Sequence, residues 1–157
     1  FFFKQKTAYE ISTRDWSSDV CSSDLEKVIP LFMTQIINGK PMTVHGIGET
    51  RRNFIHVDDV SRAIQIIMDK GEIGKTYNIG TTHEYSVLEL CDMLTQIAGV
   101  PRQVDFVKDP RAHNDSRYCI DSSELRSLGW SENFNFKQKL KETWEWYWSN
   151  KIGRAHV

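Results

Sequence analysis

The chain has 157 residues, and its 20 Lys and Arg against 21 Asp and Glu give a formal net charge of −1. A hydrophobic fraction of 39% and a charged fraction of 26% are typical of a soluble globular domain. This balance argues against a protein that coats nucleic acid with a basic surface, and no apolar run approaches the roughly 18 residues that a membrane span needs.

The two ends of the chain do not resemble protein sequence. Residues 19–25 (DVCSSDL) and 152–157 (IGRAHV) can be translated from opposite strands of one oligonucleotide, which resembles a widely used sequencing adapter. Matching ends of this kind have no explanation at the level of protein. We therefore expect residues 1–25 to be adapter-derived, non-native and disordered, residues 151–157 to be an adapter-derived tail, and residues 26–150 to be the native part.

Hydrophobic periodicity within residues 26–150 predicts helices that alternate with strands. Apolar residues recur at helical spacing over 28–37, and Gly39 is expected to end that helix as a left-handed cap. The alternation predicts an α/β chain with at least some parallel strand pairing. The remaining helices are expected near 58–70, 86–98, 122–128 and 135–149, and the strands near 42–45, 53–57, 76–79, 104–107 and 117–120.

Two helix starts carry residue types that commonly cap helices. Ser86 and Glu89 have the spacing of a capping box, and Gly99 ends the helix that they begin. Asp58 or Asp59 is expected to cap the preceding helix. The inward face of that helix is expected to carry Ala63, Ile64, Ile67 and Met68.

The three cysteines are too few and too odd in number for a disulfide framework, which favours the reducing cytoplasm. Cys21 falls in the adapter-derived segment. Cys91 lies on an apolar helix face and Cys119 in a predicted strand, so both are expected to be buried, inert thiols. The histidines lack the mutual spacing of metal ligands, and no metal site is predicted.

Two motifs that could serve a dinucleotide enzyme have simpler explanations. Residues 46–50 (GIGET) follow part of the glycine pattern of dinucleotide-binding turns, but Arg51 stands at the third glycine position. A plain turn between two strands explains these glycines better. Tyr147 and Lys151 have the spacing of a catalytic Tyr–Lys pair, but they lie on the last helix and Lys151 belongs to the tail.

Two Arg-bearing turns could hold a phosphate. Arg51 and Arg52 follow the glycine turn, and the segment 109–118 places Arg111 and Arg117 in a loop between strands. A planar guanidinium binds phosphate through two parallel hydrogen bonds. Solvated arginines at a strand end explain residues 51 and 52 equally well, so the residues alone leave both interpretations open.

Six segments together carry a family pattern, and they occur in the family's order: EKVIP (26–30), RRNFIHVDDV (51–60), GKTYNIGT (74–81), RAHNDSRY (111–118), LGW (128–130) and KETWEWY (141–147). Residues 26–150 thus resemble the C-terminal half of the NDP-glucose 4,6-dehydratases, of the dTDP-glucose or UDP-glucose type, in the extended short-chain dehydrogenase/reductase superfamily. The resemblance implies a fragment of a Rossmann-like α/β fold, with the last sheet strands and a small substrate-binding lobe.

The resemblance also implies a nucleotide-sugar site. In the family, the strand that matches residues 43–45 lines the nucleobase, and the arginine that matches Arg52 binds the diphosphate. Arg111 matches the arginine of the family's D-R-P-x-[HN]-D loop. This loop departs from the family pattern at Pro110 and Ala112, which leaves the role of Asn114 open. The implied substrate-binding residues are Lys27, Val28, Thr43, Val44, His45, Arg52, Asn78, Arg111 and Asn114.

The family is a group of lyases in which NAD takes a hydride from the sugar, water is lost, and the hydride returns to give a 4-keto-6-deoxy sugar nucleotide. Its NAD-binding and catalytic motifs lie in the N-terminal half and have no counterpart in this sequence. The resemblance therefore implies a fragment that is inactive alone, from a cytoplasmic homodimer that binds a nucleotide-diphosphate sugar. One alternative is another enzyme of the superfamily, a 4-epimerase or a UDP-glucuronate decarboxylase. The other is an inactive truncated fragment, either a non-catalytic binding module or a non-functional reading frame, which is expected to expose apolar surface.

Overall fold

The computed structural model describes residues 2–4, 27–110, 115–117 and 119–150, and every structural statement below concerns these residues. The chain divides into two compact units. Of the described residues, unit 1 contains 2–4, 53–84 and 119–136. Unit 2 contains 27–52, 85–110, 115–117 and 137–150.

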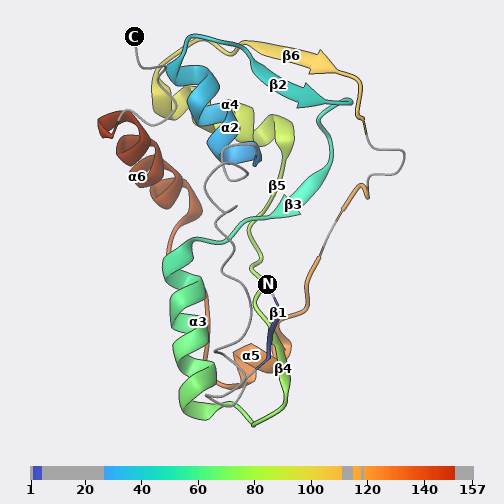
Figure 1. Cartoon of the computed structure of the whole chain (residues 1–157), viewed down its shortest axis with the longest axis vertical. Helices are drawn as coiled ribbons and strands as arrows, with labels where there is room; N and C mark the ends of the chain where they lie inside the picture. The colour runs from blue at the N-terminus through green and yellow to red at the C-terminus, as the bar shows by residue number, and fades with distance from the viewer. Residues whose placement is uncertain (1, 5–26, 111–114, 118, 151–157) are drawn as a thin grey trace, which may run out of the picture. The chain divides into compact units, whose positions relative to one another are not determined.

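Unit 2 contains a parallel strand pair, a helix that packs against it and a second helix that packs against the first. Strands β2 (Met42–His45) and β6 (Val104–Val107) pair in parallel, as the alternation of helices and strands predicted. Helix α2 (Val28–Ile37) contacts both β2 and α4 (Val87–Ala98), and Figure 1 shows the two helices on the same side of the strand pair. The side chains that form this core are Phe32, Met33, Met42, Val44, Leu90, Cys91 and Leu94.

Helix α4 begins and ends where its sequence signals predicted. The Ser86 hydroxyl accepts a hydrogen bond from the Glu89 backbone N–H at 3.1 Å, and the Glu89 carboxylate accepts one from the Ser86 N–H at 2.6 Å. These bonds satisfy two donors that a helix start otherwise leaves unpaired. At the other end, Gly99 adopts a left-handed φ of 68°. The predicted capping box and glycine stop are confirmed.

Unit 1 is built around helix α3 (Val57–Lys70), strand β4 (Thr76–Asn78) and the short helix α5 (Ser123–Ser127), which contacts β4. The Tyr77 ring is fully buried, and its hydroxyl accepts a hydrogen bond from the Glu72 N–H at 2.9 Å. The buried side chains of this core are Ala63, Ile67, Tyr77, Ile79, Leu125 and Trp130.

The start of α3 differs from its prediction. Strand β3 covers Arg51–Asn53 rather than 53–57, and it pairs with β5 (Glu84–Ser86), a strand that was not predicted. His56 is the N-cap of α3, because its side chain accepts a hydrogen bond from the Asp58 N–H. Asp58 and Asp59 therefore lie within the first helical turn, and the prediction that one of them caps the helix is wrong.

Two predictions of burial are also wrong. Met68 is 66% exposed, because it lies on the side of α3 turned away from Ala63 and Ile67. Cys119 is exposed, whereas Cys91 is buried and its burial raises the pKa of its thiol to about 11. The strand predicted at 117–120 is limited, within the residues described, to a single bridge at Arg117. The final helix, α6 (Phe136–Ser149), has nearly its predicted bounds.

A short strand from the N-terminal segment pairs with β4. Strand β1 (Phe2–Lys4) lies antiparallel to β4, with Phe3 opposite Tyr77. This strand lies inside the segment 1–25, whose predicted disorder stays a prediction. Aromatic residues favour strands, and the edge of β4 offers backbone donors and acceptors for pairing. Residues 5–26 and 151–157 lie outside the described residues, so their adapter origin stays a prediction.

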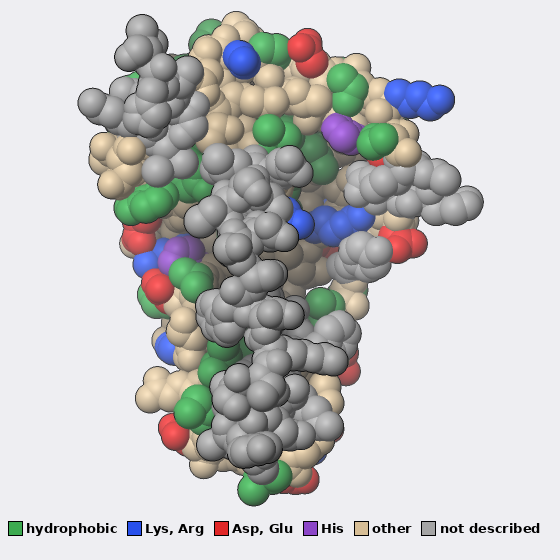
Figure 2. Space-filling model, viewed as in Figure 1, with side chains coloured by type: hydrophobic (Ala, Val, Ile, Leu, Met, Phe, Trp, Pro, Cys, Tyr) green, Lys and Arg blue, Asp and Glu red, His purple; other side chains and the backbone are tan. Residues whose placement is uncertain are grey.

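Large apolar side chains are exposed at several places in the described residues, and Figure 2 shows green patches between charged ones. Ile73 is 81% exposed and Ile47 is 71% exposed. Blue Lys and Arg side chains are interspersed with red Asp and Glu on the face shown. Among the helices described, none combines the length and the apolar character that crossing a bilayer requires.

Candidate functional site

The glycine turn after β2 positions the first arginine pair. Gly46 and Gly48 adopt left-handed φ values of 65° and 75°, and the chain then enters strand β3 rather than a helix. A dinucleotide-binding turn needs a helix start to receive the phosphates. The prediction of a plain turn between two strands is confirmed, and these residues do not fit the phosphate groups of NAD.

The two Arg-bearing segments meet at the start of β3. The Arg51 N–H donates a hydrogen bond to the Ser116 carbonyl at 2.9 Å, and Arg51 forms a parallel bridge with Arg117. The end of the loop 109–118 is therefore paired directly with the strand that carries Arg52. Arg52 Nη1 donates to the Arg51 carbonyl at 2.7 Å.

The Arg51 guanidinium faces α4. It lies 3.2 Å from the Glu89 carboxylate, which also belongs to the capping box. The hydrogen bonds from Ser86 and the charge of Arg51 together hold the pKa of Glu89 below its ordinary value. Arg51 is thus engaged by a structural carboxylate, whereas Arg52 is the arginine that the resemblance assigns to the diphosphate. Arg111 and Asn114 lie outside the described residues, and their predicted approach to Arg52 stays a prediction.

The other predicted contacts of unit 2 lie on α2 and β2. Lys27 is exposed at the N-cap of α2, and Val28 is the first helical residue. On β2, His45 is exposed, whereas the Val44 side chain is fully buried in the core. A ligand on this strand would therefore contact Val44 through its backbone.

Thr43 is held by an amide that the sequence did not single out. Gln35 of α2 accepts a hydrogen bond from the Thr43 N–H at 3.0 Å and donates one to the Thr43 hydroxyl at 2.9 Å. Both groups of the amide are used, so Gln35 fixes β2 against α2. The spacing of Gln35 and Thr43, on either side of a helix end, gives no sequence signal for this contact.

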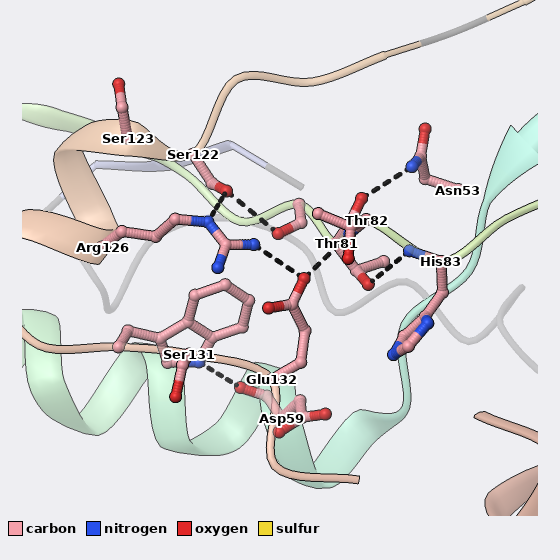
Figure 3. A network of polar contacts seen from close by, with 12 residues as sticks. Asn53, Asp59, Thr81, Thr82, His83, Ser122, Ser123, Arg126, Ser131 and Glu132 are labelled. Carbon is pink, nitrogen blue, oxygen red and sulfur yellow. Dashed lines mark hydrogen bonds and ion pairs between the residues drawn. The ribbon is translucent and has the colours of Figure 1, made fainter. Parts of the chain in front are cut away.

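Asn78 is the predicted site residue that belongs to unit 1. It is half-buried at the end of β4, and its Nδ2 donates to the Asp121 carbonyl at 3.1 Å. The segment that follows, at residues 80–82, lies in a network of polar contacts (Figure 3). Glu132 accepts hydrogen bonds from the Thr82 N–H at 2.8 Å and from Arg126 at 2.7 Å. Sequence reasoning missed this network, because its hydrogen bonds join residues far apart in the chain, such as Thr82 and Glu132, which are 50 residues apart.

The ionisation of Glu132 stabilises unit 1. Burial disfavours the charged carboxylate, but hydrogen bonds from Arg126, its own backbone and Thr82 outweigh this effect and lower the pKa from 4.5 to about 2. Because the folded state has the lower pKa, the stabilisation is present above about pH 4.5 and is lost as the pH falls toward about 2.

We therefore expect acid to weaken the wild-type chain more than a Glu132→Gln variant. Between about pH 6 and about pH 3, the unfolding free energy of the wild type should fall by about 1–2 kcal/mol more than that of the variant. Urea unfolding followed by circular dichroism at both pH values measures this difference. If the free energy of unfolding fell equally in the two proteins, Glu132 would have the same pKa in the folded and unfolded states.

The neighbouring aspartates have structural roles. Asp59 is 3% exposed, and its carboxylate accepts hydrogen bonds from Arg62 at 2.6 Å and from the Asn133 N–H at 3.1 Å. The Asp59 carbonyl also accepts the indole N–H of Trp130. Asp58 instead lies beside His56 at 3.3 Å. The two carboxylates have different partners and do not form an acid–base pair. Within the described part of the chain, no three His, Cys, Asp or Glu side chains gather as metal ligands.

Comparison with known proteins shows which families this chain is similar to. Residues 19–80 match the model of the NAD dependent epimerase/dehydratase family. The dTDP-D-glucose 4,6-dehydratase of Mus musculus is 39% identical over 132 residues, which cover 80% of this chain and 37% of that protein. This chain is homologous to the dTDP-glucose 4,6-dehydratases.

Two further relatives extend the comparison. The trifunctional UDP-glucose 4,6-dehydratase/UDP-4-keto-6-deoxy-D-glucose 3,5-epimerase/UDP-4-keto-L-rhamnose-reductase of Arabidopsis thaliana is 37% identical over 127 residues, covering 80% of this chain and 19% of that protein. The structure of dTDP-glucose 4,6-dehydratase from Bacillus anthracis in complex with NAD matches with a TM-score of 0.75 and 32% identity. The match covers 81% of this chain and 40% of that one.

These matches confirm the predicted fold class. The chain is α/β and corresponds to part of a Rossmann-like extended short-chain dehydrogenase/reductase fold. It spans at most about two fifths of the length of each of these relatives.

Proposed function

We propose that this chain is the substrate-binding part of an NAD-dependent NDP-glucose 4,6-dehydratase, a lyase that forms a 4-keto-6-deoxy sugar nucleotide. The observation that carries the proposal is the pairing of Arg51 with Ser116 and Arg117, which brings the end of the second Arg-bearing loop to the strand that carries Arg52. A diphosphate needs charged donors with matched geometry, and two paired arginine-bearing segments can supply them. The relatives named for dTDP-glucose and UDP-glucose support the same class of substrate.

The site residues divide by the part of the substrate that they would bind. Arg52 and Arg111 would hold the diphosphate through bidentate hydrogen bonds. Lys27 and Val28, at the start of α2, would lie near the sugar and nucleotide, and the strand Thr43–His45 would line the nucleobase. Asn78 and Asn114 would contribute polar contacts.

NAD, when bound to the whole protein, would accept a hydride from the sugar and return it. The residues described here lack a dinucleotide-binding turn, so this chain would bind and orient substrate without carrying out the reaction. We further propose that the whole protein is a cytoplasmic homodimer.

Binding can be tested separately from catalysis. The 157-residue chain is titrated with dTDP-glucose and with UDP-glucose while its ¹H–¹⁵N amide spectrum is recorded. Binding of one of them, with shifts on β2 and β3, is the expected result. Glucose 1-phosphate is the control, because it contains the sugar and one phosphate without the nucleotide. A folded chain that binds neither nucleotide sugar would contradict the proposal.

Catalysis needs the whole protein. Incubated with NAD and either nucleotide sugar, this chain is expected to form no 4-keto product, whereas the full-length protein is expected to form it. The 4-keto sugar is detected by its absorbance in alkali. A full-length protein that instead inverts the 4-position would assign the chain to the epimerases of the same superfamily.

A further inference from the structure

The polar network around the segment 80–82, which follows β4, closes into a ring through one guanidinium (Figure 3). On one side, the Ser122 hydroxyl donates to the Gly80 carbonyl at 3.1 Å and accepts from Arg126 Nε at 3.2 Å. On the other side, Glu132 Oε1 accepts from the Thr82 N–H at 2.8 Å and from Arg126 Nη2 at 2.7 Å. Arg126 thus holds both ends of the segment 80–82, one through Ser122 and the other through Glu132.

The members of the ring have little freedom to move. The Ser122 residue is 6% exposed, and the Glu132 side chain is 12% exposed. The Arg126 guanidinium lies 5.3 Å from the centre of the buried Trp130 ring, which fixes its plane by a cation–π contact. Its Nε and Nη2 are separate nitrogen atoms that donate to two different acceptors, whereas a lysine has only one side-chain nitrogen.

The same ring reaches the predicted ligand contact of unit 1. Asn78 lies two residues before Gly80, and its Nδ2 donates to the carbonyl of Asp121, the residue before Ser122. The ring therefore fixes the backbone that carries Asn78 and also the carbonyl that orients its amide. We propose that Arg126 is a positioning residue, which holds the Asn78 amide in the orientation that binds the nucleotide sugar. This inference rests on the proposed function, because the ligand contact of Asn78 is part of that proposal.

A double-mutant cycle in the 157-residue chain tests the inference. Affinity for dTDP-glucose is measured by titration for the wild type, Arg126→Gln, Asn78→Ala and the double variant. If Arg126 acts through Asn78, each single change weakens binding by about tenfold and the double change weakens it no further. The matched control is Glu124→Gln, because Glu124 lies on the same helix as Arg126. This change removes the exposed 2.8 Å ion pair between Glu124 and Lys75 and should leave the affinity unchanged.

A second readout needs no ligand. The side-chain amide signals of Asn78 should shift in Arg126→Gln and stay in place in Glu124→Gln. If Arg126→Gln fails to fold, Arg126→Lys is used instead, because lysine keeps the positive charge but lacks the two separate nitrogen donors of the guanidinium. Additive losses of affinity, or an unchanged Asn78 signal, would overturn the inference while leaving the proposed function intact. A wild-type chain that binds no nucleotide sugar would overturn both.

Discussion

Replacing Arg52 with glutamine is expected to weaken the binding of dTDP-glucose or UDP-glucose by about tenfold to a hundredfold. Glutamine keeps a hydrogen-bond donor but loses the positive charge and the forked geometry that matches a phosphate. A hydrogen bond to a charged group contributes about 1.5–3 kcal/mol, which corresponds to this range of affinity. Titration calorimetry of the wild-type and Arg52→Gln chains measures the change.

Two controls separate a phosphate contact from a general disturbance of β3. Arg52→Lys keeps the positive charge but lacks the planar guanidinium, so this variant is expected to lose part of the affinity for the nucleotide sugar. Thymidine or uridine, which lack phosphate, should bind the wild type and Arg52→Gln equally weakly. If Arg52→Gln retained full affinity for the nucleotide sugar, the diphosphate would have to be held by other residues.

Replacing Gly48 with alanine is expected to lower the free energy of unfolding by about 2–4 kcal/mol. Gly48 has a left-handed φ of 75°, and a Cβ at this position would lie 2.8 Å from the Leu88 side chain and 2.9 Å from Val44 Cγ1. The added methyl group would therefore push α4 and β2 apart where both belong to the core of unit 2. Urea unfolding, followed by circular dichroism, measures the loss.

The same turn supplies a matched control. Gly46 has a φ of 65°, but a Cβ there would have no neighbouring atom within 4 Å. Gly46→Ala therefore reports the backbone strain alone, which we expect to be about 1–2 kcal/mol. The difference between the two variants isolates the steric contact with Leu88 and Val44. Equal losses in both would mean that Leu88 can move aside without cost.

The elements that could be predicted from sequence are those with strong local signals. The capping box of Ser86 and Glu89, the stop at Gly99 and the strand 42–45 all depend on residues within a few positions of one another. The start of α3 was mistaken because the histidine side chain at 56 caps the helix, although Asp58 and Asp59 are the residue types that usually do so. Strand β5 was missed because it ends at Ser86, whose spacing from Glu89 signals the start of a helix.

The candidate site was predictable only in part, for a similar reason. The arginine-rich segments stand out in the sequence, but the bond between Arg51 and Ser116 joins positions far apart in the chain. Nothing near Glu132 indicates that it accepts the Thr82 N–H or pairs with Arg126. Such long-range partners are chosen by how the chain packs, and a pattern confined to neighbouring residues does not contain that information.

The outer strand of unit 2 has a consequence for work with the chain in solution. Parallel strands are ordinarily covered on both faces, yet β6 leaves Phe106 59% exposed and Val107 39% exposed. An uncovered apolar strand edge is a site at which molecules adhere to one another as they are concentrated. Purification and spectroscopy would therefore benefit from low protein concentration. Phe106→Lys would be the first substitution to make to reduce self-association.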